Sequence, residues 1–344
     1  MQYKFRSKDG ALLEADLILL PAKHCGRDFE SQFKNLLEQL SDFTRHGQEG
    51  SSLVFLRLWL SDLRNQLPIV EELLSLSSNV SVIQQAPLCG AKVAAWAHFS
   101  AHDFLEWRSH RVEQPLAEGA FGQTTALFEG LRGSLGLRGG SVGEDCLRTW
   151  LYVDDIDTNY ADMVRARNEV FDLEGLRPDT HYIASTGIEG RAGAPGVKVA
   201  MDSVCLSGKC PASVRYLRVP EYMNDTAEYG VRFERGARVT LDTHSIVFVS
   251  GTASIDPHGE ILHPGDVLAQ ASRMLENIGA VLEAAGARWS DVGQMTVYLR
   301  DITDAGPVSE FLSSRFPDIP LVIVQAPVCR PGWLIEAECL AYLN

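Results

Sequence analysis

The chain contains three copies of one sequence pattern, and this repeat restricts its possible folds more than any other feature. Each copy opens at a glutamine, at Gln32, Gln123 and Gln270, and continues with apolar residues spaced for one buried helix face. About thirty residues later, each copy has a short apolar run that ends in an acid, at Asp62, Asp155 and Asp301. The spacings are 30, 32 and 31 residues, a regularity that unrelated amphipathic helices would not show.

The rest of each copy predicts a second helix and then two strands. The first and third copies share Gln-Ala-Pro-x-Cys before their last strands, which we expect at 92–99 and 333–342. The middle copy predicts its corresponding strands at 181–188 and 197–206. A full N-terminal hairpin is expected in the third copy, at 238–254, whereas the middle copy has little room for one.

These patterns predict an α+β protein of three modules, at residues 1–105, 106–212 and 213–344. In each module we expect a mixed sheet that is backed by helices. The first two modules are expected to share a core, which gives an N-terminal domain at 1–212 and a C-terminal domain at 213–344. A chain of 344 residues, 45% of them apolar, can bury cores of this size.

Charge and motif content exclude several function classes. Forty-five acidic against 31 basic residues give a net charge of −14, so we expect no nucleic-acid partner. No run of 18 apolar residues and no secretory signal is expected, and an odd number of cysteines without CxxC is typical of reduced thiols in the cytoplasm. Because HExxH and phosphate-loop motifs are missing from the sequence, we expect no metal, nucleotide or other cofactor.

The last predicted strand carries two acids on one face. Glu336 and Glu338 alternate with Ile335, Ala337 and Cys339, so both carboxyl groups point the same way. Two buried acids destabilise a strand unless they are paired or perform chemistry, and burial raises a glutamate pKa into the range of a general acid. Ion pairing at a module boundary is the structural alternative.

The third module resembles the YjgF/Rid-like family. The resemblance is carried by Val249–Gly251, the helix at 270–285, Val297–Asp301 and Ile335–Ala341. It implies a sheet backed by two helices and, because family members are commonly trimers with sites between subunits, a monomer that folds as a pseudo-trimer. Deaminases of this family carry an arginine on the strand at 320–324, where this chain has none, which disfavours that activity.

The whole chain resembles the chorismatases, through Arg148–Val153, Thr186–Ile188, Ser250–Ala253 and Leu334–Glu338. This resemblance implies cleavage of chorismate to pyruvate plus either a hydroxybenzoate or a dihydroxycyclohexadiene carboxylate. The family's proton donor is a glutamate on the last strand. We match it to Glu336 and keep Glu338 as the alternative donor.

The product subtype and the substrate contacts are also expectations from this resemblance. Members that form 3-hydroxybenzoate carry a cysteine and a glycine that match Cys329 and Gly251, so we expect 3-hydroxybenzoate with some 4-hydroxybenzoate. Cys329 would steer the intermediate rather than attack it, and Gly251 would leave room beside the substrate ring. A core cysteine and a β-bulge glycine are the structural alternatives.

The two carboxylates of chorismate require cationic or polar contacts, and arginine binds carboxylates bidentately. Arg148 is the first candidate, and the others are Tyr222, Tyr229, Arg232 and Arg315. An ion pair for Arg148 and a helix-terminal role for Arg315 are the alternatives.

We expect one working cleft rather than three, because the other copies lack the acid pair. Counting from the cysteine places Trp96 and His98 at these positions in the first module and Ala200 and Asp202 in the second. Two further hypotheses stay open: hydrolysis of chorismate to the dihydroxy acid, and a non-catalytic protein that binds a small metabolite.

Overall fold

The computed structural model describes residues 1–112, 118–209 and 211–344, apart from the side chain of Tyr229, and confirms an α+β fold of repeated modules. Each module forms one mixed sheet. The first sheet has the order β1-β2-β5-β3-β4 and consists of β1 (Gln2–Arg6), β2 (Leu12–Leu19), β3 (Ser52–Leu60), β4 (Val80–Gln84) and β5 (Val93–Ser100). The second has the order β6-β9-β7-β8 and consists of β6 (Leu105–His110), β7 (Cys146–Val153), β8 (Ala184–Glu189) and β9 (Val199–Leu206).

The third sheet has the order β10-β11-β12-β15-β13-β14. Its strands are β10 (Ser213–Leu217), β11 (Gly236–Thr240), β12 (Ser245–Ala253), β13 (Val292–Leu299), β14 (Leu321–Gln325) and β15 (Ile335–Leu343). In every module the last strand lies antiparallel inside the sheet, beside a parallel pair. The expected N-terminal hairpin of the third module is present as β11 and β12, β1 and β2 form one in the first module, and β6 alone takes that place in the second.

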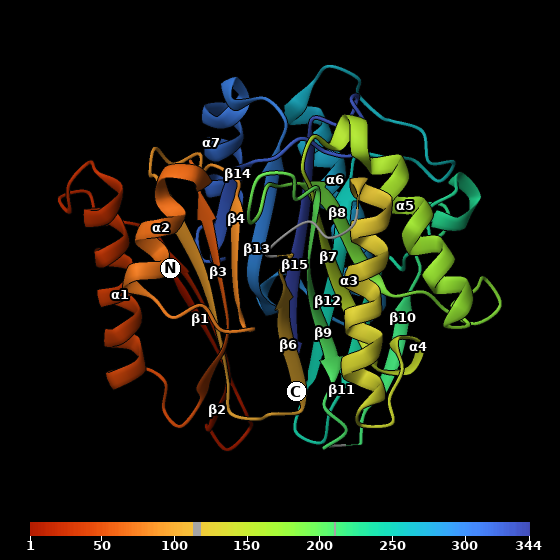
Figure 1. Ribbon diagram of the computed structural model, residues 1–344, viewed down its shortest axis with the longest axis horizontal. Helices are drawn as coiled ribbons and strands as arrows, with labels where there is room; N and C mark the ends of the chain where they lie inside the picture. Colours follow the sequence, from red (N-terminus) through yellow and green to blue (C-terminus); the bar gives the residue numbers. More distant parts are fainter. Residues whose placement is uncertain (113–117, 210) are drawn as a thin grey trace.

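Helices cover the outer side of the three sheets (Figure 1). They are α1 (Phe29–His46) and α2 (Leu63–Leu73), α3 (Gly119–Gly136), α4 (Val142–Asp145) and α5 (Ile156–Leu173), and α6 (Val267–Ala285) and α7 (Ala305–Arg315). Short 3-10 helices lie at η1 (Thr226–Tyr229), η2 (Trp289–Asp291) and η3 (Ile302–Asp304). Among the described residues, no helix is both long and apolar enough to span a membrane.

The repeated glutamine has the same structural task in every module. Its side-chain oxygen accepts a hydrogen bond from the backbone at the start of the last strand: Gln32 from Lys92 N at 2.8 Å, Gln123 from Lys198 N at 2.6 Å and Gln270 from Leu334 N at 2.9 Å. Each amide thus satisfies a backbone group where the strand emerges from its loop. This need explains why the glutamine recurs at one position of a helix that is otherwise apolar on this side.

The three sheets join edge to edge into a ring. A bridge between Gln84 and Arg191 connects the first module to the second, and one between Ile188 and Val328 connects the second to the third. A third bridge, between Pro87 and Val324, returns to the first module. Equivalent segments therefore make equivalent contacts at all three boundaries, as in a trimer.

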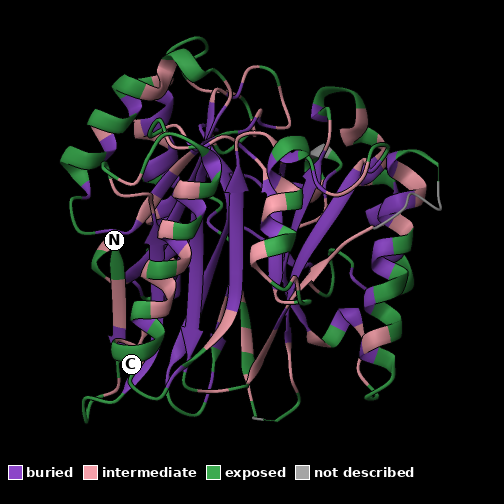
Figure 2. Ribbon diagram, turned by 60° about the vertical axis from the view of Figure 1, so that its left-hand side comes forward, coloured by how far each residue is buried: buried purple, intermediate pink, exposed green. Residues whose placement is uncertain are grey.

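The inner faces of all three sheets meet in one central core. This core includes Trp59 and Trp96 from the first module, Trp150 from the second and Tyr298 from the third. Most strands are buried along their length, whereas the outward helix faces, many loops and parts of the edge strands β1 and β10 reach solvent (Figure 2). The expectation that the first two modules alone share a core is thus too narrow, because the third module completes it.

Candidate active site

A cavity lies between the second and third modules. The second module contributes wall residues from α5 and β8, namely Tyr160, Arg167, Ser185, Thr186 and Gly187. The third module contributes Val231, Phe233, Arg235, Gly251, Ala253, Ile255, Cys329, Arg330, Trp333 and Glu336. Three of the residues selected from the sequence, Gly251, Cys329 and Glu336, therefore line one cavity.

Hydrogen bonds between β8 and β12 position the two walls. Ser185 N donates to Ser250 Oγ at 3.0 Å, and Gly251 N donates to Thr186 Oγ1 at 2.9 Å. A β-bulge interrupts the pairing of β12 with β15 between Val249 and Thr252, so Gly251 lies at the irregular point of the strand. At this bulge, the backbone of Gly251 lies close to the Glu336 carboxyl group.

The Glu336 carboxyl group is an acid that retains its proton at neutral pH. Its residue is 5% exposed and lines the cavity, and no hydrogen bond or ion pair to its carboxyl group occurs among the described residues. Burial raises its pKa to about 8, and the negative charge of Glu338 adds to this effect, while Arg148 and Arg235 oppose it. A protonated carboxyl group next to a cavity is the arrangement of a general acid.

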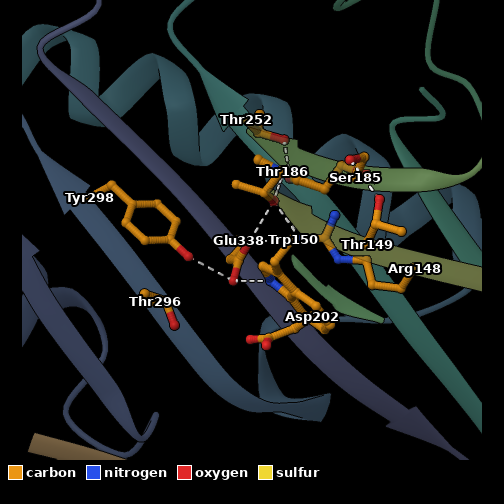
Figure 3. Close-up of polar contacts among 12 residues, drawn as sticks. Arg148, Thr149, Trp150, Ser185, Thr186, Asp202, Thr252, Thr296, Tyr298 and Glu338 are labelled. Carbon is orange, nitrogen blue, oxygen red and sulfur yellow. Dashed lines mark hydrogen bonds and ion pairs between the residues drawn. The ribbon is translucent and has the colours of Figure 1, made fainter. Parts of the chain in front are cut away.

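Glu338 lies on the same strand face but makes many polar contacts (Figure 3). Its Oε1 accepts hydrogen bonds from Trp150 Nε1 at 2.6 Å and Tyr298 OH at 3.0 Å. Its Oε2 accepts hydrogen bonds from Arg148 Nη2 at 2.6 Å and Thr186 Oγ1 at 2.5 Å. The sequence left both acids as candidate proton donors. Because the Glu338 carboxyl group is occupied by hydrogen bonds and that of Glu336, within the described part of the chain, is not, the structure favours Glu336. The ion-pair alternative applies to Glu338 alone.

Arg148 is fully buried and does not line the cavity. Its guanidinium pairs with Glu338 and stacks on Trp150 at 4.6 Å. The position disagrees with the predicted contact to a substrate carboxylate and also with a surface ion pair. Arg148 instead pairs with the buried carboxyl group of Glu338. This contact gives a structural reason for the arginine in the Arg-Thr-Trp segment.

Cys329 lines the cavity close to Glu336. Burial raises the pKa of its thiol to about 12, and the negative charge of Glu336 adds to the effect, although a hydrogen bond with Tyr160 and the charge of Arg330 lower it. The thiol is therefore neutral at physiological pH and a poor nucleophile. This disfavours covalent catalysis by Cys329, and its steering role stays a prediction.

The cavity arginines come from segments that the sequence reasoning did not select. They are Arg167 on α5, Arg235 immediately before β11 and Arg330 immediately after Cys329. Arg235 lies next to a predicted strand, and Arg330 lies next to a cysteine that was predicted to belong to the site. These two neighbours could have identified both arginines from the sequence. The arginine of Rid deaminases is indeed missing from β14, and these cations enter from other elements.

Three of the remaining substrate-binding candidates do not line the cavity. Arg232 pairs with Asp172 at 2.5 Å, Tyr222 is exposed and lies near Arg273, and Arg315 is exposed in the last turn of α7. The helix-terminal alternative therefore fits Arg315. The backbone of Tyr229 closes η1, but its side chain lies outside the described part of the chain.

The corresponding positions in the other modules lack a free acid. Tyr298 pairs with Glu336, and its equivalents Trp59 and Tyr152 pair with Ala94 and Ala200. Counting from the cysteine was therefore wrong by two residues in the first module, where Trp96 rather than His98 corresponds to Glu338. The register of the second module agrees with the sequence alignment.

The fold and the cavity define a protein of three related modules in one chain, with the buried acid Glu336 in the cavity between the second and third modules. Residues 237–343 match the family described as Endoribonuclease L-PSP. A RutC family protein of Pyrococcus abyssi is 42% identical over 101 residues, which cover 28% of this chain and 79% of the relative. The corresponding protein of Pyrococcus horikoshii is 40% identical over the same shares. The chain belongs to the RutC family through its third module.

One solved structure matches nearly the whole chain. The crystal structure of a chorismatase aligns over 96% of this chain and 99% of its own, with a TM-score of 0.67 and 18% sequence identity. At this identity the match shows a common fold of all three modules. It does not by itself transfer the activity.

Proposed function

We propose that the protein is a chorismatase that converts chorismate to 3-hydroxybenzoate and pyruvate, with some 4-hydroxybenzoate. The observation that carries the proposal is the protonated, buried Glu336 in a cavity that three arginines also line. Chorismate carries two carboxylates and an enol ether, so it requires both cations and an acid. The fold shared with a chorismatase supports the same assignment.

Glu336 would transfer its proton to the methylene carbon of the enolpyruvyl group. The positive charge then develops on the ether carbon of the side chain, which weakens the bond between the ring carbon and the ether oxygen, and cleavage of this bond releases pyruvate. In the hydrolytic alternative, water adds to the ether carbon, and the bond between this carbon and the ether oxygen then breaks. General acid catalysis of this kind accelerates reactions by roughly 10²–10⁴. Formation of hydroxybenzoate and pyruvate consumes no water overall, whereas formation of the dihydroxycyclohexadiene carboxylate consumes one molecule.

The other wall residues have assigned tasks in this proposal. Arg235 and Arg330, on either side of the third module's wall, would bind the substrate carboxylates, and Arg167 would approach from α5. Cys329 would direct the intermediate towards the aromatic product. Gly251 keeps the space that the Glu336 carboxyl group occupies, since an added Cβ would lie 2.3 Å from its Oε1.

The test is incubation with chorismate, pyruvate detection through lactate dehydrogenase and chromatography of the ring product. Pyruvate together with 3-hydroxybenzoate supports the proposal. Pyruvate with the dihydroxy acid identifies the hydrolytic alternative, and a melting shift without pyruvate identifies a non-catalytic binding protein. The cytoplasmic location and the monomeric state remain predictions.

A further inference from the structure

We propose that Glu338 is a positioning residue for the catalytic acid: its ionised carboxylate, anchored by the second module, keeps the proton on Glu336. The proposal rests on the proposed function for its kinetic test only. It assigns a purpose to the second acid of the strand, which takes no part in the cavity wall.

The hydrogen-bond pattern favours Glu338 as the ionised partner. The Thr186 hydroxyl accepts from Gly251 N at 2.9 Å and lies 2.5 Å from Arg148 Nη2, which can only donate. Its own hydrogen must therefore point to Glu338 Oε2. Trp150 Nε1 likewise can only donate to Oε1, so donors already occupy both oxygens of Glu338.

The anchor comes mainly from a different module than the acids. Arg148, Trp150 and Thr186 belong to β7 and β8, whereas Tyr298 donates from β13. Arg57 of the first module adds a weaker ion pair, with its Nη1 3.7 Å from Glu338 Oε1. All three modules thus hold one negative charge at a fixed place near the cavity.

Glu336 faces this charge from the neighbouring same-face position of β15, where both side chains are buried. In a dry environment, two such carboxylates cannot both ionise at low energetic cost, and the one with the better donors takes the charge. The other ionisable groups around Glu336 are Cys329, Tyr298, Tyr160, Arg148, Arg235, Arg330 and Arg167. The nearby arginines favour loss of the proton from Glu336. The fixed negative charge of Glu338 opposes this effect.

The kinetic test compares the wild-type protein with E338Q in the pH dependence of kcat/KM for pyruvate release. We expect the alkaline limb to move down by about one pH unit or more, since a neighbouring charge is removed while Arg148 stays. D202N is the matched control. Asp202 holds the equivalent strand position in the second module and pairs with Arg57 at 2.9 Å, so its limb should stay in place.

Infrared difference spectroscopy of the wild-type protein against E336Q tests the premise of the proposal, that Glu336 keeps its proton, without turnover or a folded E338Q variant. We expect the carbonyl band of a protonated Glu336 to disappear only near pH 8. Loss of that band below about pH 6, close to the ordinary glutamate range, would overturn the proposal. An unchanged alkaline limb in folded E338Q would overturn it as well. Absence of pyruvate release would reject the proposed function but leave the infrared result decisive.

Discussion

Gly251 and Glu336 face each other so closely that the glycine has no space for a side chain. A Cβ at position 251 would lie 2.3 Å from Glu336 Oε1 and 2.9 Å from Thr186 Cγ2. The backbone φ of Gly251 is not in the left-handed region, so the constraint is steric and local. The glycine therefore protects the position of the proposed acid.

Gly251→Ala should displace the Glu336 carboxyl group and lower kcat by about 10²-fold, because misplacement of an acid by about 1 Å has effects of that size. The measurement is the steady-state rate of pyruvate release from chorismate. Gly279→Ala is the control, since its Cβ would make only an ordinary contact at 3.5 Å with Trp289. Equal rates for both variants would show that the space at position 251 has no catalytic importance.

Glu336→Gln should abolish pyruvate release and alter the pH dependence of stability. The folded-state pKa of about 8 lies above the unfolded value of about 4.3. The folded protein therefore binds an extra proton between these values, and wild-type stability declines as the pH rises through this window, by about 1.4 kcal/mol per pH unit at most.

The glutamine variant lacks this titration, so its advantage over the wild-type protein should grow from pH 5 to pH 8. Urea unfolding at several pH values measures the difference. A constant difference between the two proteins over this range would contradict a raised pKa for Glu336.

Arg235→Ala should raise KM for chorismate by about 10–100-fold, which is the value of a lost charge-assisted hydrogen bond. Arg232→Ala is a close control, because Arg232 pairs with Asp172 outside the cavity. If KM rises in the second variant instead, the carboxylate contacts lie elsewhere than this wall.

Cys329→Ala should retain pyruvate release, since a thiol with a pKa of about 12 is not the nucleophile, and should change the ratio of ring products. Cys89→Ala, at the matching motif position of the first module, should leave both quantities unchanged. Product chromatography decides the matter, and complete loss of turnover in the first variant would point to a covalent role.

Local periodicity was sufficient to identify the repeated elements. The glutamine-led helices, the strands that end in an acid and the alternation that puts Glu336 and Glu338 on one face all follow from side-chain spacing along one segment. Such patterns are determined by neighbours in the chain, so they are readable without coordinates. The same comparison of the repeats also predicted that only the third module carries both acids.

Contacts between modules were decided by the tertiary structure. The sequence could not rank the two acids, because the four side chains that hydrogen-bond to Glu338 come from β7, β8 and β13 and meet only after the ring closes. For the same reason Arg148 was placed in the cavity and Arg235 was missed.

The connection from cysteine to last strand is two residues shorter in the first module than in the third, which shifted the alignment of Trp96 and His98. A strand's register depends on its hydrogen-bonded partner, and loop length does not encode that partner. The sequence alone therefore determined which elements form and which strand carries the acids. Packing of three sheets around one axis decided which acid keeps its proton, because desolvation and partner charges arise only there.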